Sequence, residues 1–97
     1  MKIAAFSGDI DFTSRERFRA ELGALDDAGL AIVDLTSVSY MDSTALAELI
    51  LLHRKRMRAG KSAPRIVVGQ KVARLFDVAG LQAVVELFDT LAEAQAE

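Results

Sequence analysis

Short apolar runs alternate along the chain with longer segments of helical periodicity, and this alternation limits the fold more than any other feature. The runs with the length of strands are residues 2–6, 30–35, 65–68 and 84–87. Residues 30–35 show little alternation of polar and apolar side chains, which is typical of a central strand covered on both faces. Strands that alternate with helices favour an α/β fold. We therefore expect a four-stranded, largely parallel sheet with about four helices.

Capping residues indicate where the helices begin and end. Thr13 and Glu16 fit a capping box, so the first helix is expected to begin there and to end at Gly29. The other helices are expected over residues 43–59, 70–79 and 90–96. The apolar face of the second helix is expected to consist of Leu46, Leu49, Ile50, His53 and Met57.

Two polar segments that follow strands contain most of the functional side chains. Residues 7–11 and 36–42 are expected to be turns, because they are rich in Gly, Asp and Ser. In a parallel sheet, partners and ligands usually meet the loops at the carboxyl ends of the strands. If the two strands are neighbours, these segments lie together at one edge of the domain.

The second polar segment leads into a helix start at Asp42, Ser43 and Thr44. Free amides and the helix dipole favour negative charge at such a position. One interpretation is that Asp42 or Ser43 simply caps the helix. The other is that the Ser43 hydroxyl is exposed and accepts a phosphoryl group. A phosphate would add about two negative charges beside Asp42 and repel a partner without unfolding the protein.

Composition excludes several classes of chemistry. The 97 residues are expected to form one domain over residues 1–97, and they contain no cysteine and one histidine. Disulfides, thiolate sites and multi-histidine metal centres are therefore excluded. The net charge of -2 gives no general drive toward nucleic acid. No apolar run is long enough for a membrane span and the start lacks a signal-peptide pattern, so a cytoplasmic protein without cofactor, metal or membrane insertion is expected.

Two further features have both a functional and a structural interpretation. The basic stretch at residues 53–61 is interpreted as a solvated helix end that complements the helix dipole, with an anionic partner surface as the alternative. Its histidine, His53, is expected to be a packed boundary residue rather than a ligand. A magnesium cluster of a small enzyme is the alternative to turn and cap roles for Asp9, Asp11, Asp34 and Asp42.

Residues 34–46 resemble the signature of the STAS family, which comprises the bacterial anti-sigma factor antagonists and their relatives. Residues 7–11 look like the family's Gly-Glu-Leu-Asp turn, and residues 72–81 look like its Arg-Leu-Phe-x-x-x-Gly-Leu segment. The three segments occur in the family's order and span most of the chain. The resemblance implies a STAS-like α/β domain.

The resemblance also implies a mechanism in which the protein is not an enzyme. The unphosphorylated antagonist binds an anti-sigma factor that is also a serine kinase, and this binding frees a sigma factor for transcription. By position, Ser43 is the phosphorylated residue, Thr44 is a less favoured acceptor, and a phosphatase acts on phospho-Ser43. The contact residues implied in this way are Asp9, Asp11, Tyr40, Met41, Asp42, Ser43 and Thr44.

The sequence departs from the family pattern at two places. Ala45 stands where the family usually has Gly, and its methyl group either hinders a kinase or improves the helix. The family's first strand has no counterpart before residues 3–6, which leaves an open sheet edge and room for a homodimer. A second function also stays open, that of a constitutive interaction subunit in a lipid-transport ATPase or stress-signalling complex. In that function Ser43 and Thr44 are docking contacts and phosphorylation is absent.

Overall fold

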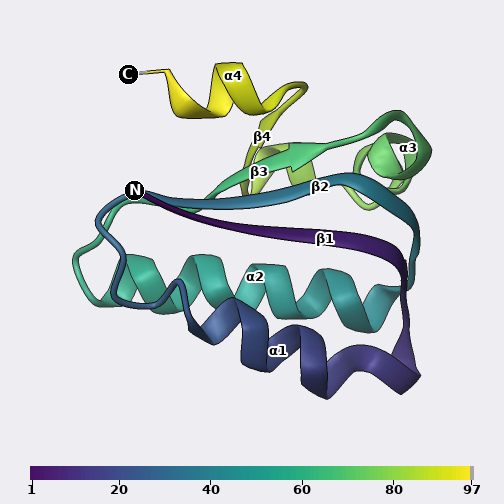
Figure 1. Cartoon of the computed structure of the whole chain (residues 1–97), viewed down its shortest axis with the longest axis horizontal. Helices are drawn as coiled ribbons and strands as arrows, with labels where there is room; N and C mark the ends of the chain where they lie inside the picture. Colours follow the sequence, from purple (N-terminus) through teal and green to yellow (C-terminus); the bar gives the residue numbers. More distant parts are fainter. Residues whose placement is uncertain (97) are drawn as a thin grey trace.

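The computed structural model describes residues 1–96 and contains a four-stranded sheet in the order β1-β2-β3-β4 (Figure 1). The strands are β1 (Lys2–Ile10), β2 (Ala31–Met41), β3 (Arg65–Val68) and β4 (Glu86–Phe88), and all three pairs are parallel. The helices are α1 (Arg15–Gly23), α2 (Ser43–Arg58), α3 (Gln70–Val78) and α4 (Leu91–Gln95). Short 3-10 turns at Phe12–Ser14 and Leu81–Ala83 precede α1 and follow α3. The expected α/β fold is confirmed.

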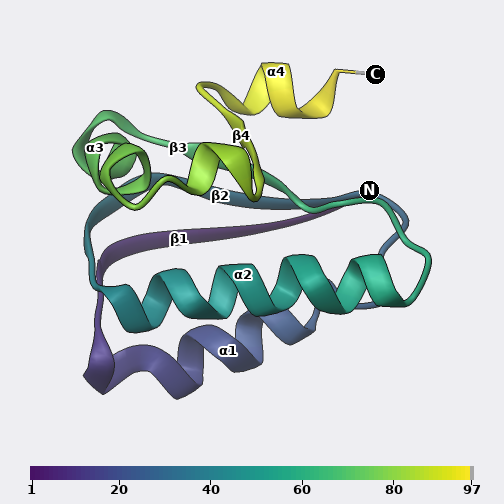
Figure 2. The same ribbon diagram turned by 180° about the vertical axis from the view of Figure 1, so that it is seen from behind.

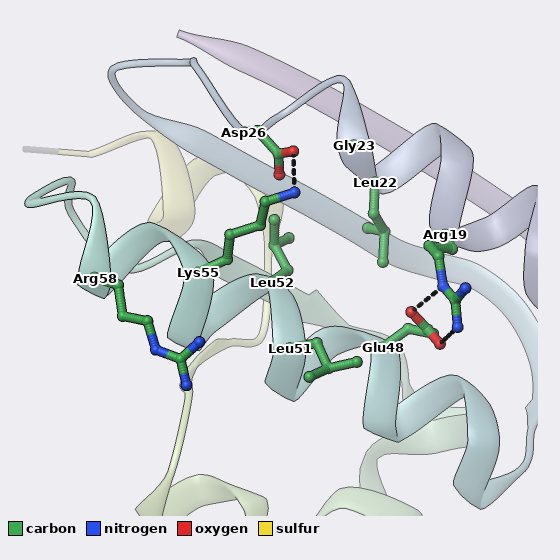
Figure 3. Close-up of a pocket in the computed structure, with 9 residues that line it drawn as sticks. All are labelled: Arg19, Leu22, Gly23, Asp26, Glu48, Leu51, Leu52, Lys55 and Arg58. Carbon is green, nitrogen blue, oxygen red and sulfur yellow. Dashed lines mark hydrogen bonds and ion pairs between the residues drawn. The ribbon is translucent and has the colours of Figure 1, made fainter.

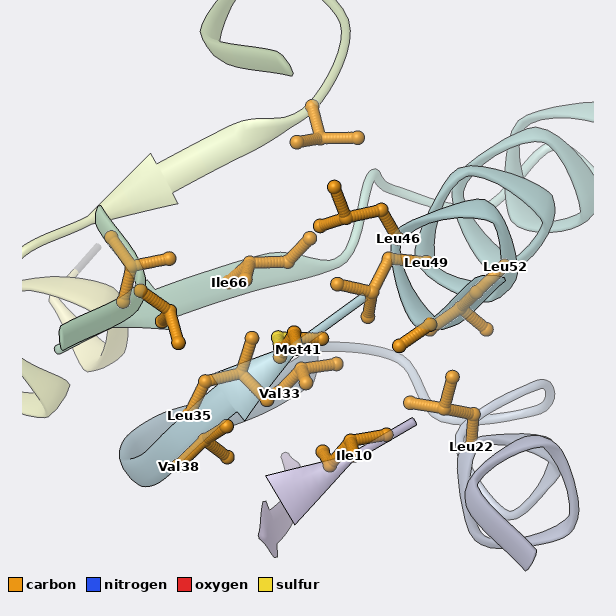
Figure 4. Packing of buried hydrophobic residues seen from close by; sticks show 14 of the residues in the cluster. Ile10, Leu22, Val33, Leu35, Val38, Met41, Leu46, Leu49, Leu52 and Ile66 are labelled. Atoms are coloured by element: carbon orange, nitrogen blue, oxygen red, sulfur yellow. The ribbon is translucent and has the colours of Figure 1, made fainter. Parts of the chain in front are cut away.

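Helices cover both faces of the sheet. The pair α1 and α2 lies side by side on one face, and α4 lies on the opposite face (Figure 1 and Figure 2). The amino-terminal part of β2 is buried from both sides, as expected for a central strand, since Ala31, Ile32 and Val33 have no exposed surface. The main core lies between the sheet and the helix pair (Figure 4). Its labelled members are Ile10, Leu22, Val33, Leu35, Val38, Met41, Leu46, Leu49, Leu52 and Ile66.

The prediction of turns at residues 7–11 and 36–42 is wrong, because β1 and β2 continue through most of both segments. The pairing register between the strands shifts after Ala5 and again after Gly8. Gly8 has a φ of 74°, a conformation that favours glycine. The residues that suggested turns therefore belong to irregular but paired strands. The apolar side chains that anchor these strand ends in the core are Ile10, Val38 and Met41.

The first helix is shorter than expected at both ends. Asp11, and not Thr13, is the first capping residue, because its carboxylate accepts the Thr13 amide at 2.9 Å. The Asp11 amide donates to the Ser14 hydroxyl at 3.1 Å and completes a capping box around a 3-10 turn. The helix ends at Gly23 and turns follow it, so Gly29 caps nothing.

The buried face of α2 includes Arg56. Met57, which was expected on this face, is exposed. Only 1% of Arg56 is exposed, so the basic stretch is not a fully solvated helix end. The guanidinium donates to the carbonyl oxygens of Leu25, Ala28, Gly29 and Ser62 at 2.8 to 3.0 Å. Because carbonyl groups satisfy these donors, the charge is accommodated without a carboxylate. His53 is half-buried, as expected of a boundary residue.

The carboxyl-terminal elements differ little from the expectation. Gly80 follows α3 with a φ of 70°, a left-handed conformation that is typical of a glycine at the end of a helix. The following 3-10 turn shifts β4 to Glu86, two residues later than the expected strand. Thr90 caps α4 by accepting the Glu93 amide at 3.1 Å. Within residues 1–96, no helix combines the length and apolarity needed to cross a bilayer.

Candidate functional site

The carboxyl ends of β1 and β2 lie side by side, because these two strands pair directly (Figure 1). Asp9 is the register partner of Tyr40, and Ile10 is that of Met41. Beyond the strands, the Asp42 amide donates to the Ile10 carbonyl at 3.2 Å. The two polar segments therefore meet at one edge of the sheet. We refer to residues 9–12 and 40–44 as the strand-end surface.

Asp42 is the residue that joins the two segments. Its Oδ1 accepts the Thr44 hydroxyl at 2.6 Å and the Ala45 amide at 3.1 Å. Its Oδ2 accepts the Phe12 amide at 2.8 Å. These donors, the Thr44 hydroxyl foremost, hold the pKa of Asp42 below its ordinary value of 3.8. Asp42 is thus the cap of α2, and it also fixes the start of the loop that leads to α1.

Because Asp42 caps α2, the Ser43 side chain is not the helix cap. Ser43 is exposed in the first turn of α2, and its hydroxyl makes no hydrogen bond with any other residue in the 1–96 range. Thr44 is half-buried and its hydroxyl already donates to Asp42. Of the two adjacent hydroxyl groups, the one on Ser43 is the more accessible for chemistry.

Asp11 has a local structural role at the same edge. Its Oδ1 accepts both the amide and the hydroxyl of Thr13, at 2.9 and 2.6 Å. These hydrogen bonds lower the pKa of Asp11 below 3.8, although the nearby charge of Asp42 opposes the shift. Asp9, two residues earlier on β1, is exposed. The strand-end surface is therefore acidic, with three carboxylates and no cationic side chain in its two segments.

Two aromatic side chains extend from the acidic surface. Tyr40 is 53% exposed and Phe12 is 73% exposed. Sequence reasoning missed Phe12, although it lies six residues before Phe18 and so out of register with the apolar face of α1. Met41, in contrast, was expected to contact a partner, and the structure corrects this prediction. It is only 2% exposed and belongs to the core, so it cannot contact a partner.

Ala45 lies directly beneath the surface. Its side chain is completely buried, and its amide donates to Asp42. The methyl group faces the core, so the expectation that it hinders an approaching kinase is not supported by its position. An alanine here instead favours the helix relative to glycine.

The four aspartates considered for magnesium do not converge on one point. Asp34 accepts the amide and hydroxyl of Thr36, while Asp11 and Asp42 serve as caps. Among residues 1–96, no three His, Cys, Asp or Glu side chains are grouped as a metal site requires.

Comparison with known proteins gives one family over nearly the whole chain. The STAS domain family matches residues 1–94. The anti-sigma-B factor antagonist of Bacillus subtilis (strain 168) is 30% identical over 82 residues. The aligned region is 84% of this chain and 75% of that protein.

Solved structures share the same architecture. An anti-sigma factor antagonist from Mycobacterium paratuberculosis has a TM-score of 0.82 at 22% identity, with 95% of this chain and 80% of that chain covered. The Bacillus cell fate determinant SpoIIAA has a TM-score of 0.70 in its unphosphorylated form, at 16% identity over 94% and 81% of the chains. Its phosphorylated form has a TM-score of 0.62, at 18% identity over 95% and 85%. At these identities the likeness shows the fold alone.

Proposed function

The chain belongs to the STAS domain family, and from this premise we propose that it acts as an anti-sigma factor antagonist. Its partner in this role is an anti-sigma factor that is also a serine kinase. Binding of the unphosphorylated protein to this partner frees a sigma factor and so regulates transcription. The role is one of binding and not of catalysis. The name of the Bacillus subtilis relative supports this assignment.

The contact surface in this proposal is the strand-end surface without the buried Ile10 and Met41. Tyr40 and Phe12 supply exposed aromatic area, which is enriched at the centres of protein interfaces. The carboxylates of Asp9, Asp11 and Asp42 surround them. A partner that fits this surface has an apolar pocket bordered by arginine or lysine.

The switch in this proposal is phosphorylation of Ser43. The observation that carries it is the exposed Ser43 hydroxyl, which stands beside a cap that already satisfies the helix start. Amides at a helix amino terminus tolerate a phosphate, so the modified protein stays folded. The phosphate places about two negative charges against the apolar pocket at the centre of the partner's surface, and the cost of desolvating them there outweighs the attraction of the basic border. A phosphatase that acts on phospho-Ser43 restores binding.

Charge substitution at Ser43 tests this function. We expect Ser43→Asp to abolish recovery of the anti-sigma factor from the protein's own host, while Ser43→Ala retains it. Ser37→Asp is the matched control, because Ser37 is an exposed β2 serine outside the strand-end surface. Circular dichroism should show all three variants folded. Undiminished binding of the anti-sigma factor by Ser43→Asp would overturn the switch at Ser43. Recovery of a transport or stress-signalling complex in place of an anti-sigma factor, equally by all variants, would instead favour a constitutive subunit in which Ser43 is a passive contact.

Homodimer formation through β1 is a separate proposal. Among residues 1–96, β1 pairs only with β2, so its outer edge is open, and Ile3 on this strand is partly exposed. The register is regular only over the first residues of β1, which limits the length of a strand-to-strand contact. Analytical ultracentrifugation over a concentration series tests this proposal. A dimer that Ile3→Lys dissociates supports it, and a monomer at all concentrations contradicts it.

A further inference from the structure

A groove between α1 and α2 shares no residue with the strand-end surface (Figure 3). Its volume is about 400 Å³, and its accessible apolar surface comes mainly from Leu51, which is 52% exposed, with the nearly buried Leu22 and Leu52 at its base. Small-molecule sites in proteins have volumes of about 300 to 1,000 Å³ and are mainly apolar, with a few polar groups. The groove therefore has the size and character of a site for a small ligand.

Gly23 keeps one side of the groove open. It is the last residue of α1, and its φ does not lie in the left-handed region. A Cβ atom built there meets no atom within 4 Å. Neither backbone conformation nor packing in this chain requires glycine, which costs a helix about 0.5–1 kcal/mol relative to alanine. The missing side chain leaves the hollow beside Leu22 and opposite α2.

The border of the groove presents positive charge to solvent. Arg19 donates to Glu48 at 2.9 and 3.0 Å, and its side chain is 52% exposed while that of Glu48 is 5% exposed. Lys55 donates to Asp26 at 2.7 Å, with exposures of 68% and 27%. In both pairs the cation is the partner that a ligand meets. Arg58 is exposed, and among residues 1–96 its guanidinium makes no hydrogen bond.

We propose that this groove binds a small amphipathic carboxylate, a free single-chain molecule with an apolar body and one anionic end. The apolar chain lies along Leu51, above the nearly buried Leu22 and Leu52, and the carboxylate binds at Arg58, whose guanidinium lies apart from the Lys55–Asp26 pair (Figure 3). An arginine guanidinium matches a carboxylate in a two-point arrangement. Leu51 and Arg58 are about two helical turns apart along α2, so a single extended molecule can contact both.

The size of the groove favours this ligand over a protein partner. A stable protein interface uses about 20–30 residues on each side. The groove has nine lining residues. Its charge pattern, cations outward and carboxylates inward, excludes a cationic ligand of the same shape.

Titration with decanoate, followed by NMR of leucine methyl groups in the full chain, tests the proposal. We expect saturable shifts of Leu22, Leu51 and Leu52 and no such response to decyltrimethylammonium or to acetate. Gly23→Leu fills the hollow and should weaken decanoate binding by at least about tenfold. Arg58→Gln should weaken it by about tenfold, the loss expected for one charge-assisted hydrogen bond.

Two matched variants separate ligand contact from indirect effects. Gly29→Leu places the same side chain outside the groove, at another glycine with open space around its Cβ position, and should leave decanoate binding unchanged. Ser43→Asp should also leave it unchanged, because the site is independent of the proposed switch. Equal affinity for decyltrimethylammonium, or full affinity in Gly23→Leu, overturns the proposal. A groove that binds an acidic helical peptide but not decanoate also overturns it, in favour of a protein partner.

Discussion

At the scale of single residues, buried or capping side chains at the two ends of α2 hold separate segments together. Arg56, near the carboxyl end of α2, binds carbonyl groups of the segments that lead into β2 and β3. Asp42, at the amino end, binds the segment that leads into α1. Each residue thus makes the placement of a loop depend on α2.

Replacement of Arg56 by lysine should destabilise the fold by roughly 3 kcal/mol, because one ammonium group cannot reach all the carbonyl groups that the guanidinium satisfies. Chemical denaturation measures the change. Arg54→Lys is the matched control on the exposed side of the same helix, and it should alter stability by less than about 0.5 kcal/mol. Equal effects of the two substitutions would contradict the structural role of Arg56.

The depressed pKa values of Asp42 and Asp11 predict a loss of stability in acid. Both lie below the ordinary value of 3.8, so the native state holds fewer protons than the unfolded state near that pH. Their contribution is complete above pH 3.8 and is lost as the pH falls through the lower native values. Asp42→Asn should lower the denaturation midpoint at neutral pH and flatten its acid dependence.

The control for this pH prediction is Asp27→Asn, since the Asp27 side chain is exposed and makes no hydrogen bond within residues 1–96. Denaturation midpoints measured between neutral pH and pH 3 compare the variants. If Asp42→Asn and the wild type lost stability in parallel, the carboxylate would not be the group responsible.

At the scale of elements, the buried side chains of α2 stabilise the fold, whereas its exposed side chains are available for binding. Leu49 is completely buried, whereas Leu51 is half-exposed on the opposite side. Leu49→Ala should cost about 2–5 kcal/mol, the usual range for a buried leucine. Leu51→Ala should cost less than about 1 kcal/mol, because little buried volume is lost. Ser43→Ala should also have little effect, since Asp42 is the cap. Thermal denaturation of the three variants checks this order, and a large effect of Ser43→Ala contradicts the exposed position.

The limits of sequence reasoning are clearest in the same elements. Helical periodicity predicts α2 and its neighbours close to their observed positions. The ends of β1 and β2 were missed, because glycine, serine and aspartate have the same local signals in a turn and in an irregular strand. Only the pairing of the two strands over a long sequence separation decides between these conformations.

For the candidate site, local spacing predicted the helix start at Ser43 but not the burial of Met41 or Arg56. Their burial depends on contacts with residues distant in the sequence. A one-residue difference on a helix separates Arg56 from Met57, and the hydrophobic pattern alone favours methionine for the core. The carbonyl groups that satisfy Arg56 come from the loops before β2 and β3, which no local pattern joins to α2.

At the scale of the whole molecule, charge is divided between two surfaces. The strand-end surface carries carboxylates, whereas arginine and lysine are abundant on α1 and α2. A partner of the acidic surface should therefore associate more slowly as salt screens the attraction. Surface plasmon resonance over a salt series measures this rate for wild type and for Asp9→Asn. The variant should associate more slowly at low salt and depend less on salt, and an unchanged rate contradicts the placement of the contact.

The account depends most directly on Ser43 as the residue that controls binding. Intact-mass spectrometry of the protein purified from its own host, with the modified site mapped, tests this claim. We expect one phosphate on Ser43 whose occupancy changes between growth and stress, and we expect the fraction bound to the anti-sigma factor to be unmodified. A phosphate at another residue, or no phosphate under any condition, would contradict the account.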